Sequence, residues 1–303
     1  MKKTLYFKNT DTGIDINELS SHDIFAMTTI EYHGKPFYDL LQQKSECYLD
    51  NDILVTFLKD YYTKPQPIAT PNIVTPKGFS FRKHELDEDQ YLHTIGTKKQ
   101  IYLHHTASDA SPFNVINYWN NNKERVATPI VIANTPLKDS YKKKFKDGDV
   151  FLCYDLDKWA YHLGTDTKPP YIFSYRQNTA LSKSSIGIEL CSWGWVYEDA
   201  YGYFRNWMHN RVGNENVITY EQAFRGKHHY FKYSDAQLKS LRNVLLYLCE
   251  KYNIDKRIKG NIFDINQYAL DGESGIYTHA SVRTDKSDCH PQPSLKRMLN
   301  SLA

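Results

Sequence analysis

A proline-rich segment divides this chain of 303 residues into two parts. Residues 64–78 contain four prolines and a glycine: Pro65, Pro67, Pro71, Pro76 and Gly78. Proline fixes φ and lacks a backbone donor, so this segment is unsuited to a helix interior or a central strand. We expect a semi-rigid linker at residues 65–80, an N-terminal region at 1–64 and a main domain at 81–303.

Strand-like and helix-like patterns alternate after the linker. Apolar runs predict strands at residues 100–104, 129–133, 150–152 and 185–190. Helices are expected to begin at Pro112, capped by Ser111, and after Ser234, where Ser234 and Gln237 form a capping box. This order predicts an α/β fold with a central mixed β-sheet flanked by helices.

The charge and hydropathy of the chain exclude several classes of protein. The formal net charge of +3 is too small to indicate a nucleic-acid partner. The first apolar run, residues 5–7, is shorter than the core of a secretory signal, and no stretch approaches the length of a membrane helix. We expect a monomer that is cytoplasmic as synthesised and does not insert into membranes.

The cysteines do not have the pattern of a disulfide framework. They are odd in number, widely spaced and without a CxxC pair: Cys47, Cys153, Cys191, Cys249 and Cys289. We therefore expect reduced thiols, most of them buried as small hydrophobic side chains.

Three histidines stand at predicted strand ends or turns: His104, His162 and His279. A zinc site needs about three nitrogen, oxygen or sulfur ligands, and residues 286–290 add lysine, aspartate, cysteine and histidine close to His279. Glu189 ends an apolar strand, where it lies either at the surface or in a cleft. In a cleft, partial burial would raise its pKa and suit it to proton transfer.

Five segments in this order resemble the zinc-dependent N-acetylmuramoyl-L-alanine amidases of type 2, a family that includes phage lysis amidases and peptidoglycan-recognition proteins. The segments are residues 101–107, 159–164, 185–190, 233–237 and 278–288. The resemblance spans about residues 98–295. It implies zinc as the cofactor and bacterial peptidoglycan as the partner.

The resemblance also implies roles for single residues. His104, His279 and Asp288 would bind zinc, with His105 a less suitable ligand than His104. Glu189 would be the base that activates water, Lys286 would stabilise the oxyanion, and His162 would help to hold substrate.

The chain departs from the family pattern at two places. Some members use a cysteine before proline as the third ligand, so Cys289 competes with Asp288. Some members also carry a catalytic tyrosine where Thr128 stands here. That absence matters less if Glu189 is the base.

Aromatic residues are concentrated directly after the Glu189 strand. They make up 14% of the chain, and eleven of them lie in residues 191–232. This insertion is either a packed extra subdomain or one wall of a substrate groove. In the second case Trp193 and Trp195 would bind substrate, because flat rings suit sugar and peptide faces.

The resemblance therefore implies a zinc hydrolase that cuts the amide bond between N-acetylmuramic acid and L-alanine. A phage-type endolysin that reaches the cell wall after release is the expected setting. The alternative is a module that binds peptidoglycan without cutting it.

Overall fold

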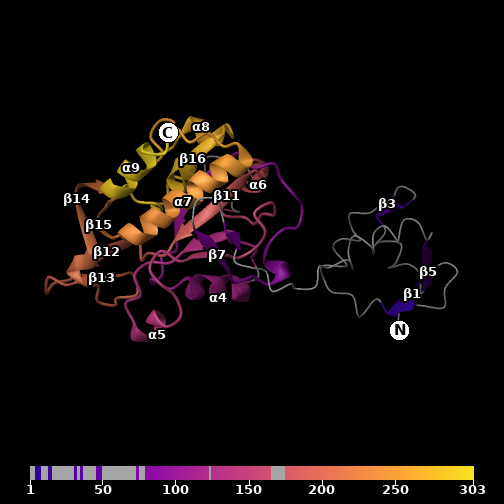
Figure 1. Ribbon diagram of the computed structural model, residues 1–303, viewed down its shortest axis with the longest axis horizontal. Helices are drawn as coiled ribbons and strands as arrows, with labels where there is room; N and C mark the ends of the chain where they lie inside the picture. The colour runs from indigo at the N-terminus through magenta and orange to yellow at the C-terminus, as the bar shows by residue number, and fades with distance from the viewer. Residues whose placement is uncertain are drawn as a thin grey trace. The chain divides into compact units, whose positions relative to one another are not determined.

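The computed structural model describes residues 79–122, 124–164 and 175–303, together with six short strands before residue 75 (Figure 1). The chain divides into two compact units, Met1–Thr70 and Pro71–Ala303. Most of residues 1–64, and most of the expected linker at 65–80, lie outside the described residues.

The first unit contains two small sheets. Strand β1 (Thr4–Phe7) lies between β2 (Gly13–Asp15) and β5 (Glu46–Leu49), antiparallel to the first and parallel to the second. Strands β3 (Glu31–Tyr32) and β4 (Lys35–Pro36) form an antiparallel pair.

A seven-stranded sheet forms the centre of the second unit, with the order β16-β8-β11-β9-β10-β7-β6. Its strands are β16 (Gly275–Thr278), β8 (Gln100–His105), β11 (Ser185–Leu190), β9 (Ile130–Ile132), β10 (Val150–Leu152), β7 (Ser80–Lys83) and β6 (Ile73–Val74). The first four are parallel, whereas β10 is antiparallel to β9 and β6 to β7. The predicted mixed sheet is confirmed.

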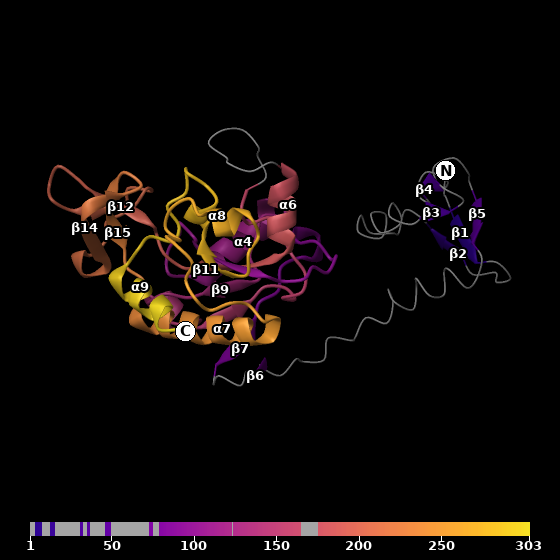
Figure 2. The same cartoon turned by 90° about the horizontal axis from the view of Figure 1, so that it is seen from above.

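Helices cover both faces of this sheet (Figures 1 and 2). Helices α7 (Asp235–Tyr252) and α9 (Pro293–Asn300) contribute Leu241 and Leu295 to the core on one face. Helix α4 (Pro112–Asn122) contributes Ile116 to a second core. Because alternate residues of a strand point to opposite faces, a strand between two helical layers supplies both cores.

The helix caps differ in part from those expected. The Ser234 hydroxyl accepts from the Gln237 backbone N–H at 3.0 Å, as predicted. The Gln237 side chain does not return the bond: it donates to the carbonyls of Ile132 and Cys191 in the core, so the expected capping box is wrong. At α4 the Ser111 hydroxyl has no hydrogen-bond partner in the described chain, and that expected cap is also wrong.

The side chain of Asp109 lies beside the start of α4. Its Oδ1 accepts from the Ser111 backbone N–H at 3.0 Å and from Asn114 Nδ2 at 2.8 Å.

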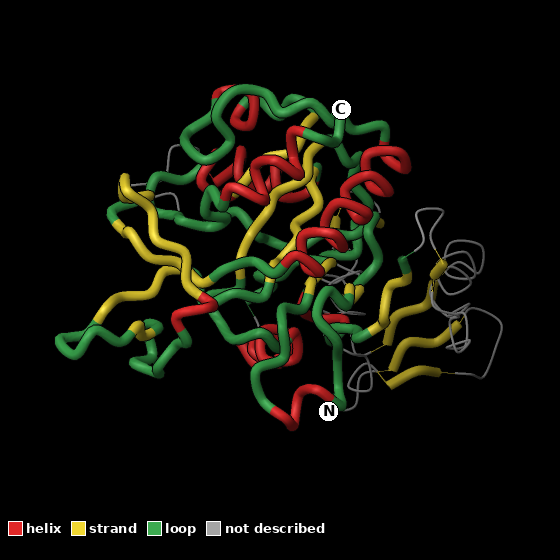
Figure 3. Tube along the Cα trace, turned by 60° about the vertical axis from the view of Figure 1, so that its left-hand side comes forward, coloured by secondary structure: helices red, strands yellow, loops and turns green. Residues whose placement is uncertain are grey.

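The aromatic-rich insertion forms a four-stranded sheet of its own, with the order β13-β12-β15-β14. The strands are β12 (Trp195–Glu198), β13 (Phe204–Arg205), β14 (Val217–Phe224) and β15 (Lys227–Phe231). They lie at the end of the unit opposite α6 (Tyr175–Lys183), and the β14–β15 hairpin is prominent in Figure 3. A small core contains Val196, Val217 and Phe231, so the insertion is a packed element.

Two shorter helices, α5 (Asp139–Lys142) and α8 (Gln267–Leu270), complete the described helices of this unit. Within the described residues, no helix has both the length and the apolar character needed to cross a membrane. Four cysteines have described side chains, and all four are buried free thiols: Cys153, Cys191, Cys249 and Cys289. Burial was expected of the first three, whereas Cys289 was expected to differ as a candidate metal ligand.

Candidate active site

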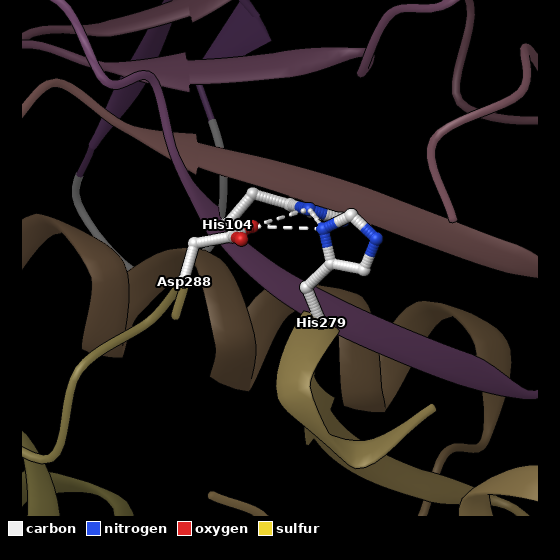
Figure 4. A group of neighbouring side chains, drawn as sticks. All are labelled: His104, His279 and Asp288. Atoms are coloured by element: carbon white, nitrogen blue, oxygen red, sulfur yellow. Dashed lines mark hydrogen bonds and ion pairs between the residues drawn. The ribbon is translucent and has the colours of Figure 1, made fainter. Parts of the chain in front are cut away.

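His104, His279 and Asp288 meet at one end of the central sheet (Figure 4). His104 is the last residue but one of strand β8. His279 follows β16, the parallel neighbour of β8, and begins a short 3-10 helix, His279–Ser281. His104 Nδ1 lies 3.1 Å from His279 Nδ1, and Asp288 Oδ2 lies 3.1 Å and 2.9 Å from these two nitrogens. Parallel strands bring their carboxyl ends to one edge, which explains why residues 175 positions apart meet here.

The Nε2 atoms of His104 and His279 form hydrogen bonds with groups outside this cluster. His279 Nε2 donates to the Leu163 carbonyl at 3.2 Å. His104 Nε2 lies 3.0 Å from His162 Nδ1, and His162 Nε2 lies 2.8 Å from the Ser185 hydroxyl.

The direction of these hydrogen bonds assigns the protons. The Ser185 hydroxyl donates to the Leu181 carbonyl at 2.6 Å, so it accepts from His162 Nε2. His162 Nδ1 then accepts from His104 Nε2, and Nδ1 of neutral His104 keeps its lone pair. In the neutral form of His279, Nδ1 likewise carries a lone pair, because its Nε2 donates to a carbonyl.

Three acceptors therefore face one another: two imidazole nitrogens and one carboxylate oxygen. Burial lowers the pKa of His104 to about 4, so this ring is neutral at pH 7. Acceptors at these distances repel unless a cation lies between them, and two histidines with one carboxylate are a donor set that suits zinc.

Glu189 lies beside this cluster on the neighbouring strand. Its Cα is paired in register with that of His104 across β11 and β8, so both side chains point to the same face of the sheet. Oε2 of Glu189 is buried and has no hydrogen-bond partner in the described chain. Burial and the nearby Asp288 raise the pKa of Glu189 well above its usual value, while Lys286 opposes this shift.

One cavity of about 450 Å³ connects these groups. Eight of the residues that the sequence singles out line it: His104, His162, Glu189, Trp193, Trp195, His279, Lys286 and Asp288. The structure thus brings together residues that come from five separate segments of the sequence.

Cys289, the competing ligand, does not line the cavity. Its side chain is buried, and its Sγ donates to the His104 carbonyl at 3.1 Å. Burial raises the pKa of this thiol well above its usual value, which opposes formation of the thiolate that zinc binding requires.

Sequence reasoning did not identify Gly187 and Ser185 as parts of the site. A Cβ on Gly187 would lie 2.5 Å from Thr128 Cγ2 and 3.2 Å from the His162 ring, so this glycine makes room for both. The two-residue period of a strand could have identified them, because Ser185, Gly187 and Glu189 lie on the same face of β11.

Trp193 and Trp195 reach the cavity from the start of the insertion. Gly194 between them has φ +70°, and a Cβ there would lie 2.5 Å from His105 Nε2. His105 in turn contacts the Tyr233 hydroxyl at 3.1 Å. The insertion therefore both packs as a subdomain and supplies one wall of the cavity.

Residues 96–293 match the family model for N-acetylmuramoyl-L-alanine amidase. No curated protein sequence matches the chain.

Several solved structures are similar at low identity. One titled "Structure of PlyL" has 14% identity and a TM-score of 0.41, covering 74% of this chain and 99% of that one. AmpDh3 from Pseudomonas aeruginosa, in complex with anhydromuramic pentapeptide, has 17% identity, a TM-score of 0.39 and coverages of 70% and 65%. The Staphylococcus aureus hydrolase AmiA, in complex with its ligand, has 11% identity, a TM-score of 0.39 and coverages of 84% and 91%.

The family model spans most of the second unit, including all of the residues that meet in the cavity. The chain belongs to the type 2 N-acetylmuramoyl-L-alanine amidase family, whose members act on peptidoglycan.

Proposed function

We propose that this protein is a zinc-dependent hydrolase that cuts the amide between N-acetylmuramic acid and L-alanine. The observation that carries the proposal is the meeting of three acceptor atoms, from His104, His279 and Asp288, beside a buried carboxylate in one cavity. We assign this chemistry to residues 81–303 and give no part of it to residues 1–64.

The metal-binding cluster and the neighbouring carboxylate have separate roles in the proposal. Zinc held by His104, His279 and Asp288 would polarise the lactyl carbonyl and acidify water. Glu189 accepts a proton from the attacking water and returns it to the leaving nitrogen of L-alanine. A carboxyl group with a raised pKa suits both steps near neutral pH.

The remaining polar and aromatic groups orient and stabilise the substrate. The ammonium of Lys286 provides positive charge where the carbonyl oxygen becomes negative. The rings of Trp193 and Trp195 form a wall that suits a sugar or peptide face.

The test is the release of stem peptide from a defined muropeptide by the zinc-loaded protein. Glu189→Gln is expected to lower kcat by about 100-fold or more while the zinc content is unchanged. Glu221→Gln, at an exposed position of β14, serves as the control and should leave kcat unaltered.

Two results would oppose the proposal. Turnover of Glu189→Gln close to wild type would reject Glu189 as the base. If the zinc-loaded wild type binds cell walls but releases no peptide from any of them, the protein is the binding module that the sequence left as an alternative.

The setting of a phage-type endolysin is also part of the proposal. It is supported by the resemblance of the five sequence segments to a family that includes phage lysis amidases. It predicts that the purified protein, added to cells whose walls are exposed, lowers the turbidity of the suspension, and that a chelator prevents this.

A further inference from the structure

A second cavity, of about 370 Å³, adjoins the catalytic one. One side comes from the amidase fold, at Asp109, Lys138 and Tyr141. The other comes from the insertion, at Asn206, Asn210 and Arg211. Apart from Trp193, none of the residues with a proposed catalytic or binding role lines this cavity.

Trp193 belongs to both cavities. Its ring packs edge to face on Trp207, with centroids 6.4 Å apart. Trp207 Nε1 donates at 2.7 Å to the carbonyl of Ala107, which lines the catalytic cavity. Trp193 is thus the side chain that the two cavities share.

Arg211 supplies an uncompensated positive charge at this cavity. Its guanidinium lies 3.8 Å from the centre of the Tyr203 ring, and it has no ion-pair partner in the part of the chain that the structure describes. Asn206 Oδ1 accepts from the backbone N–H groups of Met208 and Asn210, which fixes the turn before Arg211.

The carboxylate in the cavity does not cancel this charge. Asp109 Oδ2 already accepts from the Tyr141 hydroxyl at 3.0 Å and from Lys138 at 3.3 Å. The side chain of Lys138 remains 64% exposed, so it can also reach an anion. The cavity thus offers two cations against one carboxylate that is already paired.

We propose that the second cavity binds a carboxylate of the peptide stem, with Arg211 as its main contact. This inference rests on the proposed function. N-acetylmuramic acid uses its only carboxyl group in the amide to L-alanine. The sugar therefore offers no free carboxylate to this cavity. The peptide stem carries free carboxylates, and a guanidinium is well suited to bind such groups in a bidentate manner.

The test compares two forms of one muropeptide, with free and with amidated stem carboxylates. Arg211→Gln keeps a polar side chain at this position but shortens it and removes its charge. On the free acid it is expected to lower kcat/KM by about 10-fold, mainly through KM, because the contact is the same in the ground and transition states. On the amidated substrate it should change little.

Lys239→Gln, at an exposed position of α7, controls for the loss of one positive charge. An equal loss on both substrates, or no loss on either, overturns the proposal. A loss of affinity for a glycan fragment without peptide also overturns it, because the occupant would then be sugar.

A binding measurement separates this inference from the proposed function. A free stem peptide, which has no scissile bond, is titrated by calorimetry into wild type and Arg211→Gln. If wild type cleaves neither muropeptide, the proposed function fails; weaker peptide binding by Arg211→Gln still supports the cavity, and equal binding rejects it.

Discussion

His162 lies between the cluster of acceptors and the strand that carries Glu189. Its Nδ1 accepts from His104 Nε2, and its Nε2 donates to Ser185. This chain of hydrogen bonds fixes the ring of His104 with Nδ1 toward Asp288. His162 also lines the cavity. Orientation of His104 and the expected contact with substrate are therefore two roles that an experiment can separate.

We predict that His162→Ala lowers zinc affinity by about 10–100-fold, the usual cost of losing a group that orients a metal ligand. The measurement is a competition titration of zinc against a chromogenic chelator. His162→Gln, which can still accept from His104, should recover part of the loss. Unchanged zinc affinity with a raised KM would instead assign His162 to substrate.

Burial of the Glu189 carboxyl group lowers the stability of the fold at neutral pH. Burial raises its pKa, so the folded protein keeps the proton at pH values where the unfolded chain has released it. The contribution of Glu189 to stability is therefore most favourable at low pH and becomes less favourable as pH rises from the unfolded pKa toward the raised folded pKa.

Glu189→Gln removes this ionisation. In metal-free protein we expect the variant to have a higher free energy of unfolding than wild type at pH 7, and a similar one near pH 4. Urea unfolding at the two pH values measures the difference. If the variant and the wild type differ in free energy of unfolding by the same amount at pH 4 and at pH 7, titration of Glu189 does not cause the difference.

The types of residue at the site were predictable from sequence, but the directions of neighbouring side chains were not. Asp288 and Cys289 are adjacent, and only the local backbone turns Asp288 to the histidines and Cys289 to the His104 carbonyl. The hydrogen bonds of His162 were equally hidden, since Ser185 is 23 positions away.

At the scale of elements, the start of the insertion depends on one glycine. Gly194 has φ +70°, and His105 Nε2 lies 2.5 Å from the place of a Cβ. This left-handed turn and the close ring position the tryptophans on either side of Gly194. The aromatic composition of residues 191–232 was visible in the sequence, but the pairing of β12 with β13 and β15 was not.

We predict that Gly194→Ala lowers the free energy of unfolding by more than the roughly 1–2 kcal/mol that a left-handed φ costs an alanine. Gly226→Ala is a matched control: φ is +75°, and nothing lies within 4 Å of the added Cβ. The difference between the two variants in urea unfolding isolates the contact with His105. Equal destabilisation would show that the ring moves away freely.

At the scale of the molecule, the site joins segments that are far apart in the chain. His104 is the last residue but one of β8, His279 follows the edge strand β16, and Asp288 lies in the segment before α9. The periodicity of apolar residues was sufficient to predict strands, helices and a mixed sheet. Periodicity does not specify strand order, and strand order is what brings β16 next to β8.

Metal binding across these segments should stabilise the whole second unit. A ligand that binds only the folded state at 100 times its Kd adds about 2.7 kcal/mol. For a domain of this size, that corresponds to a rise in the thermal midpoint of about 5–10 °C. We therefore expect a chelator to lower the midpoint by this amount, and added zinc to restore both the midpoint and the activity.

Two variants identify the third ligand in the same experiment. Asp288→Asn removes the carboxylate that faces both histidines, so zinc should no longer raise the midpoint. Cys289→Ser keeps a donor for the His104 carbonyl and should retain the full zinc-dependent rise. If the serine variant loses the rise and the asparagine variant keeps it, the thiol is the ligand, and the backbone between residues 288 and 289 must turn when metal binds.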